Sequence, residues 1–310
     1  MTGTPAVARR FADIMRLLLF HNRSAGSGDV AAGDLLRAAK TYGFEPTYLE
    51  KQQGLPPPET FDHDRVVVVA GGDGTVAKAF RTFAGTGIRC TILPLGGANN
   101  VAKALGFPAS AHKVLQGLRS GRVHRFRLGE ATVGPETRRF VEAVGCGTIA
   151  AGLSGSSGAG PGATGAEKIR AGREGLSDRL GSAEPIRSRI RIDGKDLPSD
   201  LLFAEVLNVS PTGPGLNLSA GMIPGGGDLH LAFLRAAGRD AFRAALESDE
   251  ALPVEVVRGR VIEMDRQDDP LRVDDELWPA EEAGTHVRVT RSNLLVEVIV
   301  PAMAAGGEET

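Results

Sequence analysis

Blocks of wholly apolar residues and blocks with helical spacing alternate along the first 120 positions of the chain. The run 66–70 is apolar throughout, which predicts a strand buried on both faces. Val76, Phe80 and Phe83 follow at the spacing of one helix face, so a helix is expected to pack back on that strand. The same pattern predicts further strands at 16–22, 44–50 and 88–94 and further helices at 30–43, 98–107 and 110–121.

From Arg122 onward, polar and apolar residues take turns, as in half-exposed antiparallel strands. The segment 152–183 interrupts this pattern because it is rich in Gly, Ser and Ala. Its first half is expected to be a mobile loop, and its second half a weakly amphipathic helix through Ile169, Leu176 and Leu180. The strands expected in this region lie at 122–133, 138–147, 186–194, 201–210, 229–235, 254–264, 285–292 and 294–300.

These patterns predict two domains, which the length of 310 residues allows. Strands alternating with helices favour a doubly wound parallel α/β domain over residues 1–121. The alternating strands favour a β-rich domain over residues 122–298. The tail 299–310 is expected to pack back on the first domain and then to become disordered.

Composition and charge exclude several classes of protein. A net charge of −2 and 5% aromatic residues argue against a nucleic-acid partner. Cys90 and Cys146 lack metal-ligand spacing and are expected to be packing residues in a reducing, cytoplasmic compartment. The longest apolar run near the N-terminus, 17–20, is too short for a signal peptide, and no apolar run is long enough to span a membrane. The sequence leaves two possibilities undecided: peripheral contact with the inner membrane surface, and assembly into a homodimer.

Three glycine-rich segments fall at expected strand ends: 21–29, 70–75 and 94–100. The carboxyl ends of neighbouring parallel strands meet at one edge of a sheet, so the three segments are expected to build one nucleotide site. A helix that starts there offers unpaired N–H groups to phosphate. Asp73 is a poor residue for a simple turn and is expected to orient Mg²⁺ beside the phosphates. The alternative is a tight turn that binds no ligand.

Several motifs together resemble the diacylglycerol kinase catalytic family, which includes bacterial lipid kinases, sphingosine kinases and ceramide kinases. GGDGT at 71–75 is preceded by NRSAG at 22–26 and followed by LPLGGANNVAKALG at 93–106. In the second half, VGCGTIAAGL at 144–153 resembles a glycine-rich strand end of the family. RVDDELWPA at 272–280 falls where the family carries Asp-Gly-Glu. The resemblance runs nearly from end to end.

The resemblance implies an ATP-dependent lipid kinase that moves the γ-phosphoryl group to a hydroxyl of diacylglycerol or a related long-chain lipid. It also implies a first domain similar to phosphofructokinase and NAD kinase, and an all-β sandwich that holds the lipid. Glu276 would be the general base, and Asp73 would act with Mg²⁺. The residues expected to bind ATP are Asn22, Arg23, Ser24, Ala25, Gly26, Gly71, Gly72, Asp73, Gly74, Thr75, Val76, Ala77, Gly97 and Asn99.

The chain departs from the family pattern at three positions. Gly97 replaces a threonine, so a hydroxyl expected near the nucleotide is missing. Asp275 replaces the glycine of Asp-Gly-Glu, and glycine adopts a positive φ more readily than aspartate does. Gly226 replaces an aspartate of a structural Mg²⁺ site, and Asp228, two residues on, is the expected substitute ligand. These changes leave the fold unaffected but bear on rate, metal use and catalysis.

Two alternatives therefore stay open. A weakened or non-catalytic family member would bind nucleotide or lipid without turnover. An NAD kinase would share GGDGT and the chain length, but it fits the segment 93–106 less well than a lipid kinase does.

Overall fold

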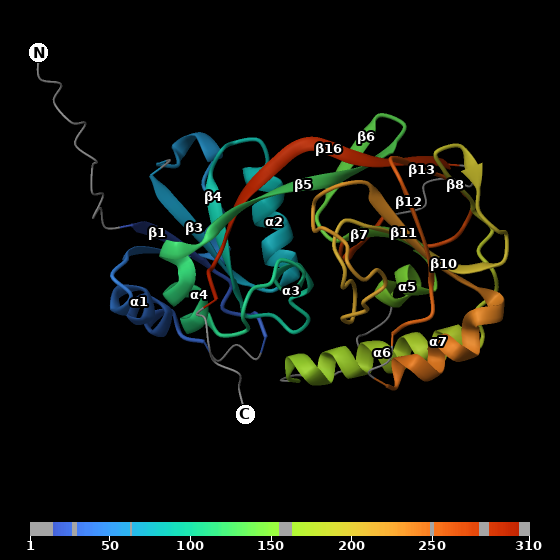
Figure 1. Cartoon of the computed structure of the whole chain (residues 1–310), viewed down its shortest axis with the longest axis horizontal. Helices are drawn as coiled ribbons and strands as arrows, with labels where there is room; N and C mark the ends of the chain where they lie inside the picture. The colour runs from blue at the N-terminus through green and yellow to red at the C-terminus, as the bar shows by residue number, and fades with distance from the viewer. Residues whose placement is uncertain are drawn as a thin grey trace, which may run out of the picture.

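The computed structural model describes residues 15–26, 30–62, 64–154, 163–248, 251–278 and 285–303. Two lobes lie side by side and are linked by two long strands (Figure 1). The first lobe contains four parallel strands in the order β2-β1-β3-β4. These are β1 (Arg16–His21), β2 (Glu45–Glu50), β3 (Arg65–Gly71) and β4 (Arg89–Pro94), with helices α1 (Ala32–Thr41), α2 (Asp73–Phe83), α3 (Asn100–Ala104) and α4 (Ala111–Gly117).

Two sheets face each other in the second lobe. Sheet A continues from the first lobe, whereas sheet B is a separate, wholly antiparallel sheet in the order β12-β11-β10-β7-β14-β15. Sheet A adds β5 (Arg122–Val133), β6 (Glu136–Phe140), β8 (Arg189–Ile192), β9 (Lys195–Asp196), β13 (Val261–Arg266) and β16 (Thr285–Val300). Sheet B consists of β7 (Ala143–Gly147), β10 (Leu201–Leu207), β11 (Leu229–Arg235), β12 (Glu255–Gly259), β14 (Leu271–Val273) and β15 (Glu276–Trp278).

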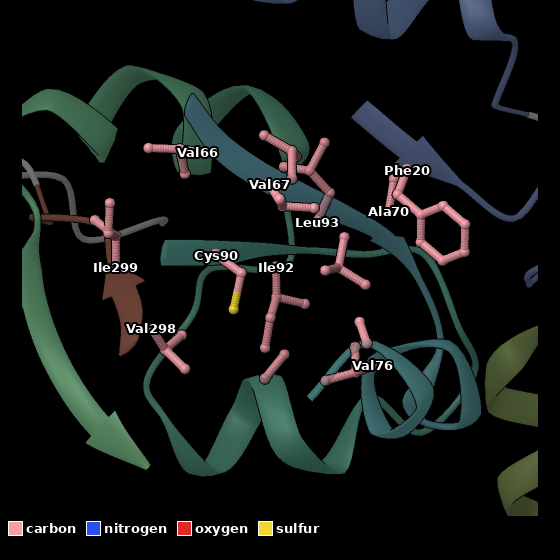
Figure 2. Packing of buried hydrophobic residues seen from close by; sticks show 14 of the residues in the cluster. Phe20, Val66, Val67, Ala70, Val76, Cys90, Ile92, Leu93, Val298 and Ile299 are labelled. Atoms are coloured by element: carbon pink, nitrogen blue, oxygen red, sulfur yellow. The ribbon is translucent and has the colours of Figure 1, made fainter. Parts of the chain in front are cut away.

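Strand β16 joins the two lobes. It pairs in parallel with β4, where Val298 lies opposite Cys90, and antiparallel with β5 along most of its length. Figure 2 shows Val298 and Ile299 beside Cys90 and Ile92 in the apolar core of the first lobe. Two separate strands were expected at 285–292 and 294–300. That prediction is wrong, because a register shift between Arg291 and Leu295 lets one strand continue through both.

The chain stays against the first lobe after β16. Ala302 donates its N–H to the carbonyl oxygen of Gly117 at 3.1 Å, and Thr91 Oγ1 donates to Ile299 O at 2.8 Å. The chain is thus bonded to the first lobe as far as Ala302, whereas the side chain of Met303 is exposed. The disorder expected beyond it concerns residues outside those described.

The second lobe has two cores. One fills the space between sheets A and B, and Phe140, Phe233 and Trp278 belong to it. The other lies between the outer face of sheet B and helices α5 (Thr148–Ala151), α6 (Gly165–Gly181) and α7 (Arg239–Leu246). Figure 1 shows α6 and α7 side by side along this face.

The expected α/β domain with a β-sandwich is confirmed, but the sandwich also carries a layer of helices. The helix expected through Ile169, Leu176 and Leu180 is α6. The mobile loop expected before it includes residues 155–162, which lie outside those described. Helix α7 was missed, although Phe242 and Leu246 show helical spacing.

Candidate active site

The loops after β1, β3 and β4 meet at one edge of the parallel strands. Asn22 follows β1, and it donates its backbone N–H to Ala70 O at 2.9 Å and its Nδ2 to Thr75 Oγ1 at 3.0 Å. Leu95 follows β4 and donates its N–H to Gly71 O at 3.0 Å. The expected convergence of the three glycine-rich strand ends is therefore present.

Glycine is required where these loops touch. A Cβ added to Gly96 would lie 2.4 Å from the Cα of Gly72. A Cβ added to Gly26, whose φ is 64°, would lie 2.3 Å from the carbonyl oxygen of Leu95. The loops thus pack backbone against backbone, and the first turn of α2 starts beside them with N–H groups that have no partner within the helix.

Asp73 is the first residue of α2, and its side chain reaches the start of α3. Its Oδ1 accepts a hydrogen bond from the N–H of Val101 at 3.1 Å. Burial, together with the nearby carboxylate of Glu142, raises the pKa of Asp73 to about 7. A carboxyl group with such a pKa, beside free helix N–H groups, can bind a cation or exchange a proton near neutral pH.

A cavity of about 250 Å³ lies beside Asp73, between the two lobes, and is called the acidic cavity below. Four carboxylates and one guanidinium group line it. Two larger grooves, of about 640 and 610 Å³, lie beside α6 and α7, but no predicted site residue lines either of them. The acidic cavity is lined by Asp73, Gly74, Ala77, Asn100, Val101, Val141, Glu142, Leu153, Gly213, Arg272, Asp274 and Asp275.

Glu142 is held in the wall of the acidic cavity by donors from both lobes. Asn100 Nδ2 donates to its Oε2 at 3.0 Å, whereas Thr212 Oγ1 and Gly213 N donate to its Oε1 at 2.7 Å each. Asn100 belongs to α3 in the first lobe, whereas Thr212 and Gly213 belong to the second. The carboxylate of Glu142 therefore joins the two lobes through its hydrogen bonds.

Arg272 lies behind Glu142 and pairs with Glu205. Its Nε and Nη2 approach the two carboxylate oxygens of Glu205 at 3.1 and 2.8 Å. Both residues lie opposite Gly145 on the strand between them, and a Cβ there would lie about 2.1 Å from the Glu205 carboxylate. The missing side chain of Gly145 therefore lets a buried ion pair form across strand β7.

Asp274 and Asp275 form the tight turn between β14 and β15, and Glu276 begins β15. Asp274 has a φ of 54°, and its carboxylate accepts the N–H groups of Val141 and Glu142 and pairs with Arg81 at 3.2 Å. Burial raises the pKa of Asp274 to about 6 although these donors oppose the shift. The positive φ of this turn is therefore at Asp274, and Asp275, which replaces the family's glycine, does not have one.

Glu276 begins β15, and its role as the general base stays a prediction. It is exposed at the start of β15 and does not line the acidic cavity. Asp275 lines the cavity instead, since its Oδ2 lies 2.8 Å from where a Cβ on Gly74 would be. The structure therefore brings Asp73 and Asp275 together and leaves Glu276 outside.

The other predicted residues lie in or next to the three glycine-rich segments. Gly71 ends β3, Gly72 precedes α2, and Asp73, Gly74, Thr75, Val76 and Ala77 form its first turns. Asn22, Arg23, Ser24, Ala25 and Gly26 form the loop after β1, where Arg23 pairs with Glu50 at 3.7 Å. Asn99 turns back on its own loop, because its Oδ1 accepts from Gly96 N and its Nδ2 donates to Gly96 O.

Asp228, the expected substitute metal ligand, has no further metal-ligating side chains grouped around it among the described residues. Asp228 is exposed in the loop before β11, and its carbonyl oxygen accepts from Arg291. Among the described residues, no group of three or more His, Cys, Asp or Glu side chains is placed to hold a metal ion. A metal at Asp228 therefore stays a prediction without partner ligands in the described part of the chain.

Five residues of the site were not predicted: Asn100, Glu142, Arg272, Asp274 and Asp275. Three of them left a signal, because Glu142 and Arg272 are charged residues between apolar ones, and Asn100 directly follows the predicted Asn99. A charge in an otherwise buried strand indicates a paired or functional group.

Helix α6 of the second lobe touches the nucleotide loops of the first. A Cβ on Gly97 would lie 3.2 Å from the Cα of Gly165, the first residue of α6. Lys168 Nζ donates to Gly26 O at 3.2 Å. The glycine that replaces the family's threonine therefore allows α6 to lie directly on the loop after β4.

We expect Gly97→Thr to push the start of α6 away from this loop. The new side chain has no space there, so the free energy of unfolding should fall by about 1–3 kcal/mol. Amide hydrogen exchange should also become faster in the first turns of α6. Ala98→Thr, at the next, half-buried position, is the control. Unchanged stability and unchanged exchange in Gly97→Thr would show that the contact is not tight.

Residues 16–131 match the sequence profile of the diacylglycerol kinase catalytic domain. Among functionally curated proteins, no sequence relative was found. None of the described helices is both long and apolar enough to cross a membrane.

Solved structures share the fold over nearly the whole chain. A Bacillus anthracis str. Sterne protein provisionally called a diacylglycerol kinase has a TM-score of 0.68 at 17% identity, covering 93% of this chain and 98% of its own. A diacylglycerol kinase of the same organism has a TM-score of 0.64 at 16% identity, and the match covers 94% of this chain and 99% of that kinase. An Archaeoglobus fulgidus NAD kinase in complex with ATP has a TM-score of 0.53 at 14% identity, and the match covers 92% of this chain and 93% of that kinase. These likenesses concern the fold alone. The profile match shows that residues 16–131 are a region of the diacylglycerol kinase catalytic domain family. This match supports the assignment of the chain as a kinase.

Proposed function

We propose that the chain is an ATP-dependent lipid kinase that transfers the γ-phosphoryl group to a hydroxyl of diacylglycerol or a related long-chain lipid. The observation that carries the proposal is that three glycine-rich strand ends meet at the start of α2, within the region that matches the family and beside the acidic cavity. Phosphoryl transfer mainly needs phosphates held in line, charge neutralisation, and a base near the acceptor hydroxyl.

The phosphates would lie at the first turn of α2. Free N–H groups and the helix dipole favour negative charge there, and Gly72 and Gly74 let the backbone approach closely. Lys168, which donates to Gly26 O, would bring a positive charge to the same loops from the second lobe. Asn22, bonded to Thr75 Oγ1, fixes the loop after β1 against α2.

The donor set beside α2 suits Mg²⁺, which prefers one or two carboxylates together with phosphate oxygens. Asp73 is the carboxylate at this position, and the acidic lining of the cavity would repel a nucleotide without its cation. When bound, Mg²⁺ would neutralise charge that builds up on the phosphate oxygens. The side chain of Asp73 would keep its hydrogen bond to Val101 N and so stay oriented.

The acceptor hydroxyl would enter the acidic cavity from the junction of the two lobes. Among the apolar residues of the lining, Leu153 is the most exposed, at 41%, so the acyl chains would leave past it toward the second lobe. Peripheral contact with a membrane surface is part of this proposal, since such an acceptor resides in a bilayer. Glu276 is the base that the resemblance implies, but its place outside the cavity speaks against it.

The test is to offer several acceptors together with γ-labelled ATP and Mg²⁺. We expect label in the organic phase with diacylglycerol, sphingoid base, ceramide or phosphatidylglycerol micelles, and none in NAD. Label in NAD alone would favour an NAD kinase, which shares the fold. Protection from thermal unfolding by ATP, without label in any acceptor, would favour a binding protein without turnover.

A further inference from the structure

The turn between β14 and β15 places a carboxylate over the start of α2. Asp275 stands where the family has glycine, and its Oδ2 lies 2.8 Å from where a Cβ on Gly74 would be. Both residues line the acidic cavity together with Asp73. The substitution therefore adds a side chain at the place where the proposed phosphates and acceptor would meet.

The carboxylate of Asp275 differs from the other three of the cavity in its hydrogen bonding. Asp73 accepts from Val101, Glu142 accepts from three donors, and Asp274 accepts backbone N–H groups and pairs with Arg81. For Asp275, no hydrogen bond or ion pair to any other residue of the described chain is present. Its oxygens are thus free to accept a proton from a bound molecule.

The turn that carries Asp275 is firmly held. Asp274, directly before it, is buried and accepts the N–H groups of Val141, Glu142 and Ala143 through one carboxylate. Arg272 Nη1 also donates to Asp274 O at 2.6 Å. These bonds fix the backbone of the turn and so the place from which the Asp275 side chain projects, while the carboxylate itself can still turn toward a bound molecule.

Glu276 has a different environment. It lies opposite Val273 as the first residue of β15 and, although it is exposed as Asp275 is, it does not line the acidic cavity. A base must come within about 3 Å of the proton that it takes, directly or through one water molecule.

We propose that Asp275, rather than Glu276, accepts the proton of the acceptor hydroxyl; this inference rests on the proposed function. As the hydroxyl oxygen bonds to the γ-phosphorus, its proton moves to a carboxylate oxygen of Asp275. The bond between the γ-phosphorus and the bridging oxygen breaks, and ADP leaves with the electron pair. Asp275 then returns the proton to water.

The test compares Asp275→Asn, Asp275→Gly and Glu276→Gln with the wild-type protein. Label transfer from γ-labelled ATP gives kcat, calorimetry gives the dissociation constant of ATP, and activity is followed as Mg²⁺ is varied. We expect both Asp275 variants to lose on the order of 10²-fold in kcat, far more than Glu276→Gln, with ATP affinity within about threefold. Extra Mg²⁺ should not restore the rate.

The following results would overturn this inference while leaving the kinase in place. They are a full rate in the Asp275 variants, a larger loss in Glu276→Gln, and recovery of Asp275→Asn by Mg²⁺, which would make the residue a metal ligand. A rate that rises in Asp275→Gly would also contradict it, because the carboxylate would then hinder the reaction. A wild-type protein that labels no acceptor would overturn the proposed function and this inference together.

Discussion

Asp73→Asn is expected to lower the rate of phosphoryl transfer on the order of 10³-fold. The carboxylate stands at the start of α2 beside the cavity where the phosphates would lie, and an amide cannot neutralise or bind Mg²⁺ as a carboxylate does. The amide oxygen can still accept the N–H of Val101, so the loop geometry should persist. The measurement is kcat with saturating Mg²⁺ and ATP.

Asp240→Asn is a matched control, because Asp240 is also an acidic residue in the first turn of a helix, but it is exposed on α7. We expect that variant to keep the wild-type rate. Comparable rates in Asp73→Asn and Asp240→Asn would remove Asp73 from the mechanism.

The variant Asp73→Asn also tests whether the pKa of Asp73 is raised. The pKa is about 7 in the folded protein and lower in the unfolded chain, so the folded state binds more protons between these values. Without Mg²⁺, the free energy of unfolding of the wild type should therefore fall relative to that of Asp73→Asn as pH rises from about 4 to about 7. A difference that does not change with pH would contradict the shift.

Arg272→Met is expected to lower the free energy of unfolding by about 3–5 kcal/mol. The variant leaves Glu205, which is fully buried, without the guanidinium group that holds both of its carboxylate oxygens. It also removes donors to Thr212 Oγ1 and to Asp274 O, which support the wall of the acidic cavity. Urea unfolding of the purified variant measures the loss.

Arg189→Met tests whether burial is the cause. Arg189 makes a similar two-point contact with Asp196, at 2.7 Å for each bond, but both side chains are at least half exposed. We expect that variant to lose much less stability than Arg272→Met does, because water screens an exposed ion pair. The double variant Arg272→Met with Glu205→Leu should recover much of the loss, since no buried charge is left unpaired. Equal losses in Arg272→Met and Arg189→Met would refute the argument from burial.

Much of the fold could be predicted from the sequence because its periodicities are strong. The apolar run 66–70 has no polar position, so it could only be a strand covered on both faces. The glycine-rich ends of three neighbouring strands had to meet at one edge, and the bonds from Asn22 to Thr75 and from Leu95 to Gly71 join them there.

The rest depends on contacts that no local pattern encodes. Glu205 and Arg272 are 67 positions apart and meet only because Gly145 separates them in the sheet. The contact between Gly97 and Gly165 depends on how the two lobes pack. Which of Asp275 and Glu276 lines the acidic cavity depends on the shape of the turn. That shape includes a positive φ at Asp274, which the sequence did not predict.

The central claim is that ATP places its phosphates at the first turn of α2, and calorimetric titration of Mg²⁺-ATP into two leucine variants tests it most directly. Gly74→Leu fills the acidic cavity from α2, whereas Lys78→Leu places the same side chain on an exposed position one turn further along. We expect Gly74→Leu to weaken ATP binding about 100-fold with little loss of thermal stability, because only the end of the exposed Asp275 side chain, 2.8 Å from the new Cβ, must move aside, and leucine favours helix more than glycine does. Lys78→Leu should bind as the wild type does. Wild-type affinity in Gly74→Leu would contradict the claim and place the nucleotide elsewhere.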